Sequence, residues 1–249
     1  MSGHSKWATI KRAKAKTDAA RGKAFTKVIR EIAAAARIGG GDPTGNPRLR
    51  LAIDKAKSAN MPNDNIKRAI EKATGGGEGA SIEEVIYEGY GPGGIAIMIE
   101  CITDNKMRTL NEIRFLFSRN GGNLGESGSV GWMFKKKGVL NFERSSINED
   151  ALMADAIDAG AEDIATEESV VTVETAPEKF EQIRNALTAK KYEPATAEIT
   201  MVPTNTIKLE GEDAQKILKF IDALEENDDV QKVHANFDIP DEIIAADEK

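Results

Sequence analysis

The fold is decided by residues 138–201, which read GVLNFERSSINEDALMADAIDAGAEDIATEESVVTVETAPEKFEQIRNALTAKKYEPATAEITM. Four segments of this stretch have the composition and length of strands, and two have the apolar spacing of amphipathic helices. In chain order they are strand 138–143, helix 148–160, strands 163–166 and 170–174, helix 177–190 and strand 196–201. This order is that of the ferredoxin-like fold. We therefore expect a ferredoxin-like α+β domain at residues 135–203.

The flanking segments resemble two halves of a second such domain. Before the block, the sequence predicts a buried strand that begins at Ile95, a helix at 107–119 and a strand at 129–134. After the block, it predicts strand 205–209, helix 211–226 and strand 230–236. Joined together, these pieces again have the ferredoxin-like order. We expect them to form a domain of residues 80–134 plus 204–249, with residues 135–203 inserted between its second and third strands.

The first third of the chain has a helical pattern. One helical face carries the apolar residues Phe25, Val28, Ile29, Ile32 and Ala36. The glycines at 39–41 end that helix, and two further short helices are predicted from about Arg48 and from about Asn63. The glycines at 75–77 close the region. The sequence therefore predicts an α+β fold of three domains, with an all-helical domain at 1–79 before the two ferredoxin-like ones.

Charge is strongly segregated along the sequence. The net charge is −7, but residues 1–75 carry 17 Lys and Arg against 6 Asp and Glu, a balance of +11. The remaining 174 residues carry 17 Lys and Arg against 35 Asp and Glu, a balance of −18. Segregation of this kind indicates a module that binds a polyanion.

The cations are densest at the start of the chain, where residues 1–37 hold ten Lys and Arg against two acids. A solvated helix face normally mixes both signs, so this run favours contact with nucleic-acid phosphates, which attract cations through counterion release. Trp7 lies in this run and either stacks on a base or anchors the segment by burial. The candidate nucleic-acid-binding residues are Lys6, Trp7, Lys11, Arg12, Lys14, Lys16, Arg21, Lys23, Arg48, Arg50 and Arg108.

A second group of cations lies on the predicted helix 107–119. Arg108, Arg114 and Arg119 stand out in an otherwise acidic part of the chain. They either extend the basic surface or pair with local carboxylates, and the sequence leaves both interpretations open.

Other functions find little support in the sequence. Residues 5–23 lack a continuous apolar face for insertion into a bilayer, and no apolar run approaches about 20 residues, so we expect no membrane binding. There is no zinc-ligand spacing, no Gly-x-Ser-x-Gly motif and no phosphate-binding loop with its lysine. We therefore expect no catalytic residues, no metal, no cofactor and no enzymatic activity. The single cysteine, Cys101, fits a buried and inert thiol in a reducing compartment.

Two glycine-dense segments each allow two interpretations. Residues 121–128 resemble a phosphate cradle but contain Glu126 and no lysine, which favours a simple turn. Residues 88–94 form either a tight entry into the following strand or a loop that approaches a partner closely. In the second case Tyr87 and Tyr90 would be available to stack on bases.

Several motifs of the chain occur together in one known family. They are Gly3-His4-Ser5-Lys6-Trp7, Arg21-Gly22-Lys23, Gly39-Gly40-Gly41-Asp42-Pro43, Asn46-Pro47-Arg48-Leu49-Arg50, Tyr87-Glu88-Gly89-Tyr90-Gly91-Pro92-Gly93-Gly94, Thr103-Asp104-Asn105 with Arg108-Thr109, and Gly121-Gly122-Asn123-Leu124-Gly125. In this ordered series, which covers nearly the whole chain, the sequence resembles the YebC/PmpR family. The pair Lys106-Met107 departs from the more polar, arginine-containing usage of that family, which weakens a contact role for Lys106.

The resemblance implies a helical N-terminal domain, two α+β domains and a bacterial cytoplasmic location. Relatives that carry a targeting segment, such as the mitochondrial translational activator of cytochrome c oxidase, have it before the motif that here begins at Gly3. The family implies either DNA-binding regulation of transcription, or a ribosome-associated translation factor that binds ribosomal RNA and relieves stalling at proline-rich stretches. Phosphate contacts carry no base information, so the basic residues do not separate these two functions. No long heptad run requires a dimer, and we expect a monomer.

Overall fold

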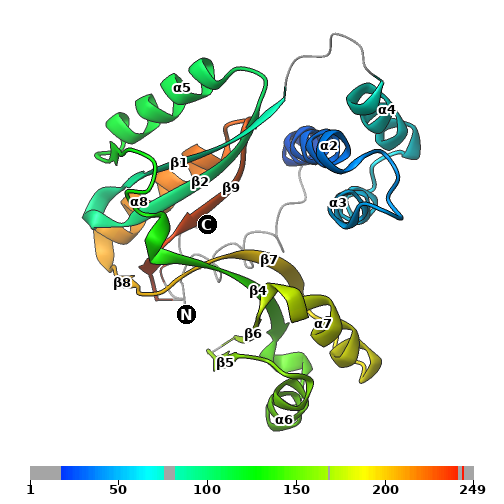
Figure 1. The fold of residues 1–249 in the computed structure, drawn as a ribbon. Helices are drawn as coiled ribbons and strands as arrows, with labels where there is room; N and C mark the ends of the chain where they lie inside the picture. Colours follow the sequence, from blue (N-terminus) through cyan, green and yellow to red (C-terminus); the bar gives the residue numbers. More distant parts are fainter. Residues whose placement is uncertain (1–17, 76–81, 168, 241–242, 244–249) are drawn as a thin grey trace. The chain divides into compact units, whose positions relative to one another are not determined.

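The structure is a computed structural model that describes residues 18–75, 82–167, 169–240 and 243 (Figure 1). Contacts between Cα atoms divide the described residues into two compact units. One unit holds the residues up to 131 together with 210–233, and the other holds 132–209 together with the residues from 234 onward. The predicted α+β class is confirmed, because a helical N-terminal region is followed by two four-stranded sheets and their helices.

Three helices form the N-terminal region: α2 (Asp18–Gly39), α3 (Pro47–Ser58) and α4 (Asn63–Thr74). Their apolar faces meet in one core, as the helical spacing predicts. The buried residues of that core are Val28, Ile32, Ala35, Ala36, Leu49, Ala52, Ala56, Met61, Ile66 and Ala69. Many of them are alanines, which allow the three helix backbones to approach closely.

Asn46 fixes the loop between α2 and α3. Its side-chain oxygen accepts a hydrogen bond from the backbone N–H of Leu49 at 3.1 Å and so caps α3. Its amide nitrogen donates to the backbone carbonyls of Ala35 at 2.8 Å and Gly40 at 2.9 Å. A Cβ at Gly39 would lie 2.6 Å from this amide, so the glycine leaves room for the buried asparagine. These residues of the glycine- and proline-rich motif therefore build the turn.

The first sheet has the strand order β3-β1-β2-β9 and belongs mostly to the same unit as the helical region. Its strands are β1 (Glu83–Tyr90), β2 (Ala96–Thr103), β3 (Asn123–Leu124) and β9 (Val230–Ala235). β1 and β2 form an antiparallel hairpin. Helices α5 (Lys106–Arg119) and α8 (Gly211–Glu225) pack on each other through Phe117 and Phe220, whose ring centroids are 5.0 Å apart.

The details of this sheet differ from the sequence prediction. The strand β1 was not predicted, and the strand expected at 129–134 is absent, because residues 131–133 form a short 3-10 helix. The strand expected at 205–209 shortens to β8 (Ile207–Lys208), which pairs in parallel with β10 (Phe237–Asp238). The sequence did not predict β1 because its side chains do not alternate between apolar and polar, as they do in a half-exposed strand. Instead, the three consecutive residues Tyr87, Glu88 and Gly89 are all buried.

The second sheet confirms the ferredoxin-like order predicted for residues 135–203. Its strands are β4 (Phe134–Glu143), β5 (Asp163–Thr166), β6 (Val170–Thr175) and β7 (Thr196–Pro203), and its helices are α6 (Glu149–Ala159) and α7 (Phe180–Ala189). The order in the sheet is β5-β6-β4-β7, with every neighbouring pair antiparallel. β4 begins four residues before the predicted start at Gly138. The helices share one core with the sheet, whose buried residues are Leu140, Phe142, Leu152, Ala156, Val171, Val173, Phe180, Ile183 and Leu187.

The close packing at Gly89 gives a direct test of the first sheet. A Cβ at Gly89 would lie 2.5 Å from the carbonyl oxygen of Asn123 and 2.7 Å from the ring of Phe117. We expect Gly89→Ala to lower the free energy of unfolding by roughly 1–3 kcal/mol, as overpacking does. Gly22→Ala is the control, because nothing lies within 4 Å of its Cβ position and alanine favours the helix there. Equal melting curves for Gly89→Ala and the wild type, in urea or by heat, would contradict this packing.

Candidate nucleic-acid interface

Most of the predicted basic segment lies outside the described residues. This holds for Lys6, Trp7, Lys11, Arg12, Lys14 and Lys16. Arg21 lies in α2, but its side chain is not among those described. The roles of these seven residues therefore stay predictions.

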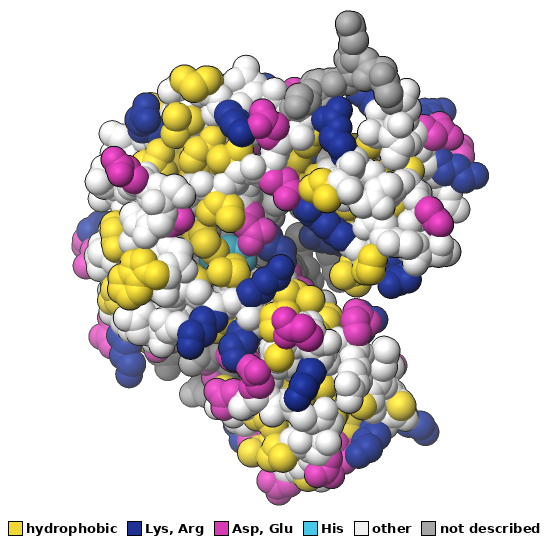
Figure 2. All heavy atoms as spheres, viewed as in Figure 1, with side chains coloured by type: hydrophobic (Ala, Val, Ile, Leu, Met, Phe, Trp, Pro, Cys, Tyr) yellow, Lys and Arg dark blue, Asp and Glu magenta, His cyan; other side chains and the backbone are white. Residues whose placement is uncertain are grey.

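The three helices carry a further set of cations at exposed positions. Six of them are exposed and have no carboxylate partner among the described residues: Lys23, Arg50, Lys57, Lys67, Arg68 and Lys72. Lys23 and Arg50 were predicted as contacts, whereas the other four were not singled out. Their helical spacing, opposite the buried residues of α3 and α4, is the sequence signal that could have found them. Figure 2 shows Lys and Arg side chains scattered over this region together with a few acids.

The guanidinium of Arg48 forms ion pairs with two carboxylates. Its Nε donates to Glu31 at 2.8 Å, and its guanidinium also pairs with Glu84 at the start of β1. Burial disfavours the charged guanidinium, but the bonds and charges of both carboxylates outweigh burial and raise the pKa of Arg48. The positive charge of Arg48 is thus already compensated within the chain.

Arg108 is similarly engaged. Its guanidinium donates to Asp229 Oδ2 at 2.9 Å and to Asp104 at 2.7 Å, and these contacts raise the pKa of Arg108. This answers the question left open by the sequence, because Arg108 pairs with carboxylates. Arg114 and Arg119 are exposed on α5 and have no such partner among the described residues. The structure therefore separates the three arginines of this helix.

Asp229 is the centre of a buried polar cluster at the end of β2. Its side chain is 3% exposed, and its carboxylate also pairs with Arg30 of α2. The hydroxyls of Thr109 and Thr103 lie 2.6 and 3.1 Å from Oδ2. Burial opposes ionisation of this carboxyl, but the bonds from Arg108 and Thr109 and the charge of Arg30 outweigh it and lower the pKa of Asp229. Three residues of the family motif therefore donate hydrogen bonds to Asp229, which lies 120 or more residues further along the chain: Thr103, Arg108 and Thr109.

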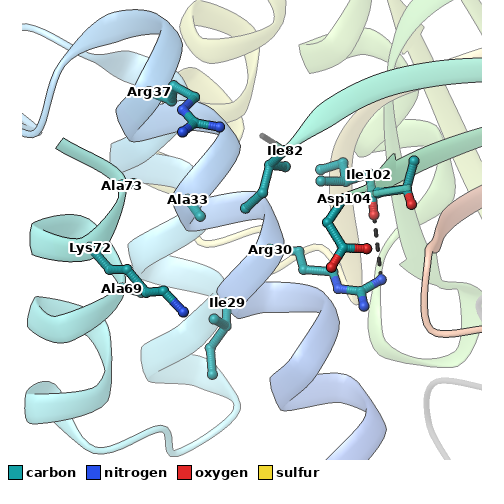
Figure 3. Close-up of a pocket in the computed structure, with 11 residues that line it drawn as sticks. Ile29, Arg30, Ala33, Arg37, Ala69, Lys72, Ala73, Ile82, Ile102 and Asp104 are labelled. Carbon is teal, nitrogen blue, oxygen red and sulfur yellow. Dashed lines mark hydrogen bonds between the residues drawn. The ribbon is translucent and has the colours of Figure 1, made fainter. Parts of the chain in front are cut away.

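Helix α2 makes further contacts with the end of α8 and with the segment between α8 and β9, which contains Asp229. Lys27 Nζ donates to the carbonyl of Glu225 at 2.6 Å, and Arg30 donates to the carbonyl of Asp228 at 2.7 Å. Arg30 also reaches the carbonyl of Ile102 at 3.4 Å, the bond drawn in Figure 3. A cavity of about 230 Å³ lies beside this contact, lined by α2, α4 and the end of β2. One side of α2 thus uses its cations to dock on the sheet.

The motif at residues 87–94 is explained by packing. The carboxylate of Glu88 is buried and accepts hydrogen bonds from the backbone N–H groups of Gly128, Val130 and Gly131 at 2.9, 2.8 and 2.6 Å. Burial opposes ionisation of Glu88, but these three bonds outweigh it and lower its pKa. Tyr87 is buried, so it is not available for stacking in this state.

The segment 121–128 forms turns around the short strand β3, as the simpler of its two interpretations predicts. β3 pairs with β1, so that Leu124 lies opposite Gly89. A Cβ at Gly122 would lie 2.8 Å from the carbonyl of Tyr90, and the N–H of Gly125 donates to the carbonyl of Glu88 at 2.8 Å. The two glycine-dense motifs therefore pack against each other.

Cys101 is buried in β2, as predicted for it. Burial raises the pKa of its thiol to about 12, and the nearby charge of Asp229 acts in the same direction. A thiol with so high a pKa holds its proton at neutral pH and is a poor nucleophile. In the described part of the chain, no helix combines the length and apolar character needed to cross a bilayer.

Comparison with known proteins accounts for almost the entire chain. Residues 5–76 match the family described as the TACO1/YebC protein N-terminal domain, and residues 82–237 match the TACO1/YebC second and third domain. The chain belongs to the TACO1/YebC family. The predicted resemblance to YebC proteins is thereby confirmed.

Relatives within the TACO1/YebC family are similar over their full length. A "probable transcriptional regulatory protein" of Syntrophus aciditrophicus (strain SB) is 59% identical over 245 residues, covering 98% of each chain. One of Geotalea uraniireducens (strain Rf4) is 54% identical over 242 residues, covering 97% of this chain and 98% of the relative. The crystal structure of a conserved hypothetical protein from Aquifex aeolicus is 49% identical, with a TM-score of 0.82 over 91% of this chain and 94% of that one. The fold described above is thus that of the YebC family.

Proposed function

We propose that this TACO1/YebC-family chain is a non-enzymatic, nucleic-acid-binding regulator of gene expression. The observation that carries the proposal is the balance of +11 in residues 1–75 against −18 in the rest of the chain. A polyanion is the partner that such a surface attracts most strongly. The name shared by the two curated relatives above, probable transcriptional regulatory protein, agrees with this class of function.

The contacts of the described residues support a division between cations that bind phosphates and cations that position the helices. Four cations of α3 and α4, like Lys23 and Arg50, are exposed and have no carboxylate partner among the described residues: Lys57, Lys67, Arg68 and Lys72. We assign these six residues to phosphate contacts together with the basic segment 6–21. Arg48 and Arg108 are tied to Glu31 and Asp229, and we assign them to positioning the helices that carry the interface. Neutralised pairs of this kind add little to counterion release.

The connection between α3 and α4 supports duplex DNA as the target. The two helices are joined by the four residues 59–62, the connection length of a helix-turn-helix, and Asn60 takes the left-handed conformation with φ 59°. Asn63 then opens α4 as an exposed residue, followed by the exposed Lys67 and Arg68. Asparagine at the start of a second helix is suited to adenine, and the following cations are suited to phosphates. We therefore favour a DNA-binding transcriptional regulator.

The alternative is a ribosome-associated factor that binds ribosomal RNA and relieves stalling at proline-rich stretches. It is favoured by the ten cations and two acids of residues 1–37, because a segment so poor in acids suits a channel crowded with phosphates. In either case we propose a monomer that acts in the bacterial cytoplasm without metal, cofactor or membrane. We also propose three working domains, 1–79, 80–134 plus 204–249, and 135–203.

The test measures affinity for genomic duplex fragments and for single-stranded RNA at several salt concentrations, with co-sedimentation on ribosomes in parallel. DNA regulation predicts fragments bound about a thousand-fold more tightly than bulk DNA at physiological salt. Uniform weak binding to DNA, with co-sedimentation on ribosomes, would favour the alternative. Absence of binding to every probe would remove the proposal.

Two variants examine the role of α4. Lys67→Ala should weaken binding to all sequences alike and reduce the slope of log affinity against log salt by about 0.9 on duplex DNA. Asn63→Ala should instead relax the preference among fragments by about 1–3 kcal/mol and leave that slope unchanged. Lys219→Ala, at an exposed position on α8, is the control for charge. A change of slope in Lys219→Ala equal to that in Lys67→Ala would contradict the assignment.

A further inference from the structure

The outer face of α5 has an unusual composition. Met107 and Phe115 are 66% and 60% exposed, and they lie two turns apart on the same side of the helix. The opposite side buries Thr109, Ile113 and Phe117 against the rest of the unit. Figure 2 shows apolar side chains gathered where Figure 1 places α5, with Lys and Arg beside them. These two side chains offer exposed apolar area on one face of the helix, where a partner can bury it.

The charges on this face are positive and available. Arg114 and Arg119 are exposed, have no acidic partner among the described residues and flank Phe115 along the helix. The one acid of this helix, Glu112, is exposed one turn before Phe115 and accepts a hydrogen bond from Asn227 at 2.7 Å. Two arginines against this one acid leave the face with a net positive charge, although residues 76–249 carry a large excess of acid.

We propose that this face of α5 binds single-stranded nucleic acid, with a base stacked on Phe115 and phosphates on Arg114 and Arg119. An exposed aromatic ring between two arginines combines the stacking platform and the phosphate contacts that such strands use. The two arginines are separated by roughly 7.5 Å along the helix axis, so they contact different phosphates. An unpaired strand is required because a base in a duplex is already stacked on its neighbours. The inference rests on the proposed function and adds a second contact outside the helical region.

The experiment measures the affinity of the full chain for a fluorescent single-stranded RNA of about 15 nucleotides by anisotropy, at several salt concentrations. Phe115→Ala should weaken binding roughly 5- to 150-fold without changing the salt slope, because stacking is lost and no ion is involved. Phe115→Trp should restore the affinity, whereas Phe115→Leu, which keeps apolar area, should not. Arg114→Ala with Arg119→Ala should reduce the salt slope by about 1.4.

Lys135→Ala with Lys136→Ala is the matched control, since it removes two exposed cations elsewhere. Rescue by leucine as well as tryptophan would overturn stacking and assign the face to an apolar protein partner. Unchanged affinity and slope in the α5 variants, with binding still lost on neutralising residues 11–16, would overturn this inference and leave the proposed function standing. Failure of the wild-type chain to bind the single strand, with duplex DNA still bound, would overturn this inference alone. Failure to bind both the single strand and duplex DNA would overturn this inference and the proposed function.

Discussion

Replacing Lys11, Arg12, Lys14 and Lys16 together by alanine is expected to abolish tight nucleic-acid binding at physiological salt. These residues are four of the ten cations in the first 37 residues. Each lost phosphate contact reduces the slope of log affinity against log salt by about 0.9 on duplex DNA and about 0.7 on single strands. Four contacts correspond to a change of slope of about 3.6 or about 2.8, and to an affinity loss on the order of a thousand-fold at 0.1 M salt. Anisotropy titrations between about 50 and 200 mM salt would measure both quantities.

The control for this variant removes the same number of positive charges from residues 135–208. Lys135, Lys136, Lys179 and Lys208 are exposed, and replacing them by alanine should leave the slope close to that of the wild type. Melting curves of both variants should match the wild type, because none of the replaced cations belongs to a described core. If both quadruple variants lost affinity equally, binding would depend on net charge and not on the N-terminal segment.

The second large effect is expected at Asp229. Asp229→Ala leaves Arg30 and Arg108 facing each other without their shared buried acid, and it removes the acceptor of the Thr109 hydroxyl. The expected cost is about 1.5–3 kcal/mol of unfolding free energy, the range for hydrogen bonds to charged groups, because the arginines left behind are 24% and 42% exposed and water screens their charge. Urea unfolding would measure the loss. Asp213→Ala is the control, because Asp213 is exposed, pairs with Lys216 at 3.2 Å and should contribute less than about 1 kcal/mol.

This contribution should also depend on pH. The pKa of Asp229 is lowered in the folded chain from its ordinary value of 3.8, so the ionised carboxylate stabilises the fold above that value. The stabilisation is lost as the pH falls from about 4 through the lowered pKa, where the folded state must take up the proton. The difference between the wild type and Asp229→Asn should therefore shrink with acid below about pH 4. A difference that stays constant between pH 6 and pH 2.5 would contradict the assignment.

The sequence predicted the local patterns well and the long-range partners poorly. The strands and helices of residues 135–203 were predictable because Leu140, Phe142, Val171 and Val173 form short apolar runs between helices of clear period. The three N-terminal helices were predictable for the same reason. β1 was not, since its buried residues include Glu88, whose hydrogen-bond donors come from a loop 40 residues later.

The candidate site likewise has features that the sequence predicts and long-range contacts that it does not. The excess of cations in the first third is a property of composition and was visible at once. The partner of Arg108 was not, because Asp229 lies 121 residues further along the chain and nothing in its local sequence marks it as buried. The available cations of α3 and α4 required knowledge of which acids lie beside them. Spacing alone therefore identified a basic region but not which of its charges are already compensated.

The link between Arg30 and Asp229 has a consequence for biosynthesis. Arg30 leaves the ribosome 199 residues before the acid that receives it. At a synthesis rate of about 5–20 residues per second, the interval between the two is about 10–40 s. During that interval helix α2 has only the earlier contacts, such as Arg30 with the carbonyl of Ile102, and the ion pair with Asp229 must wait until the last tenth of the polypeptide is being made.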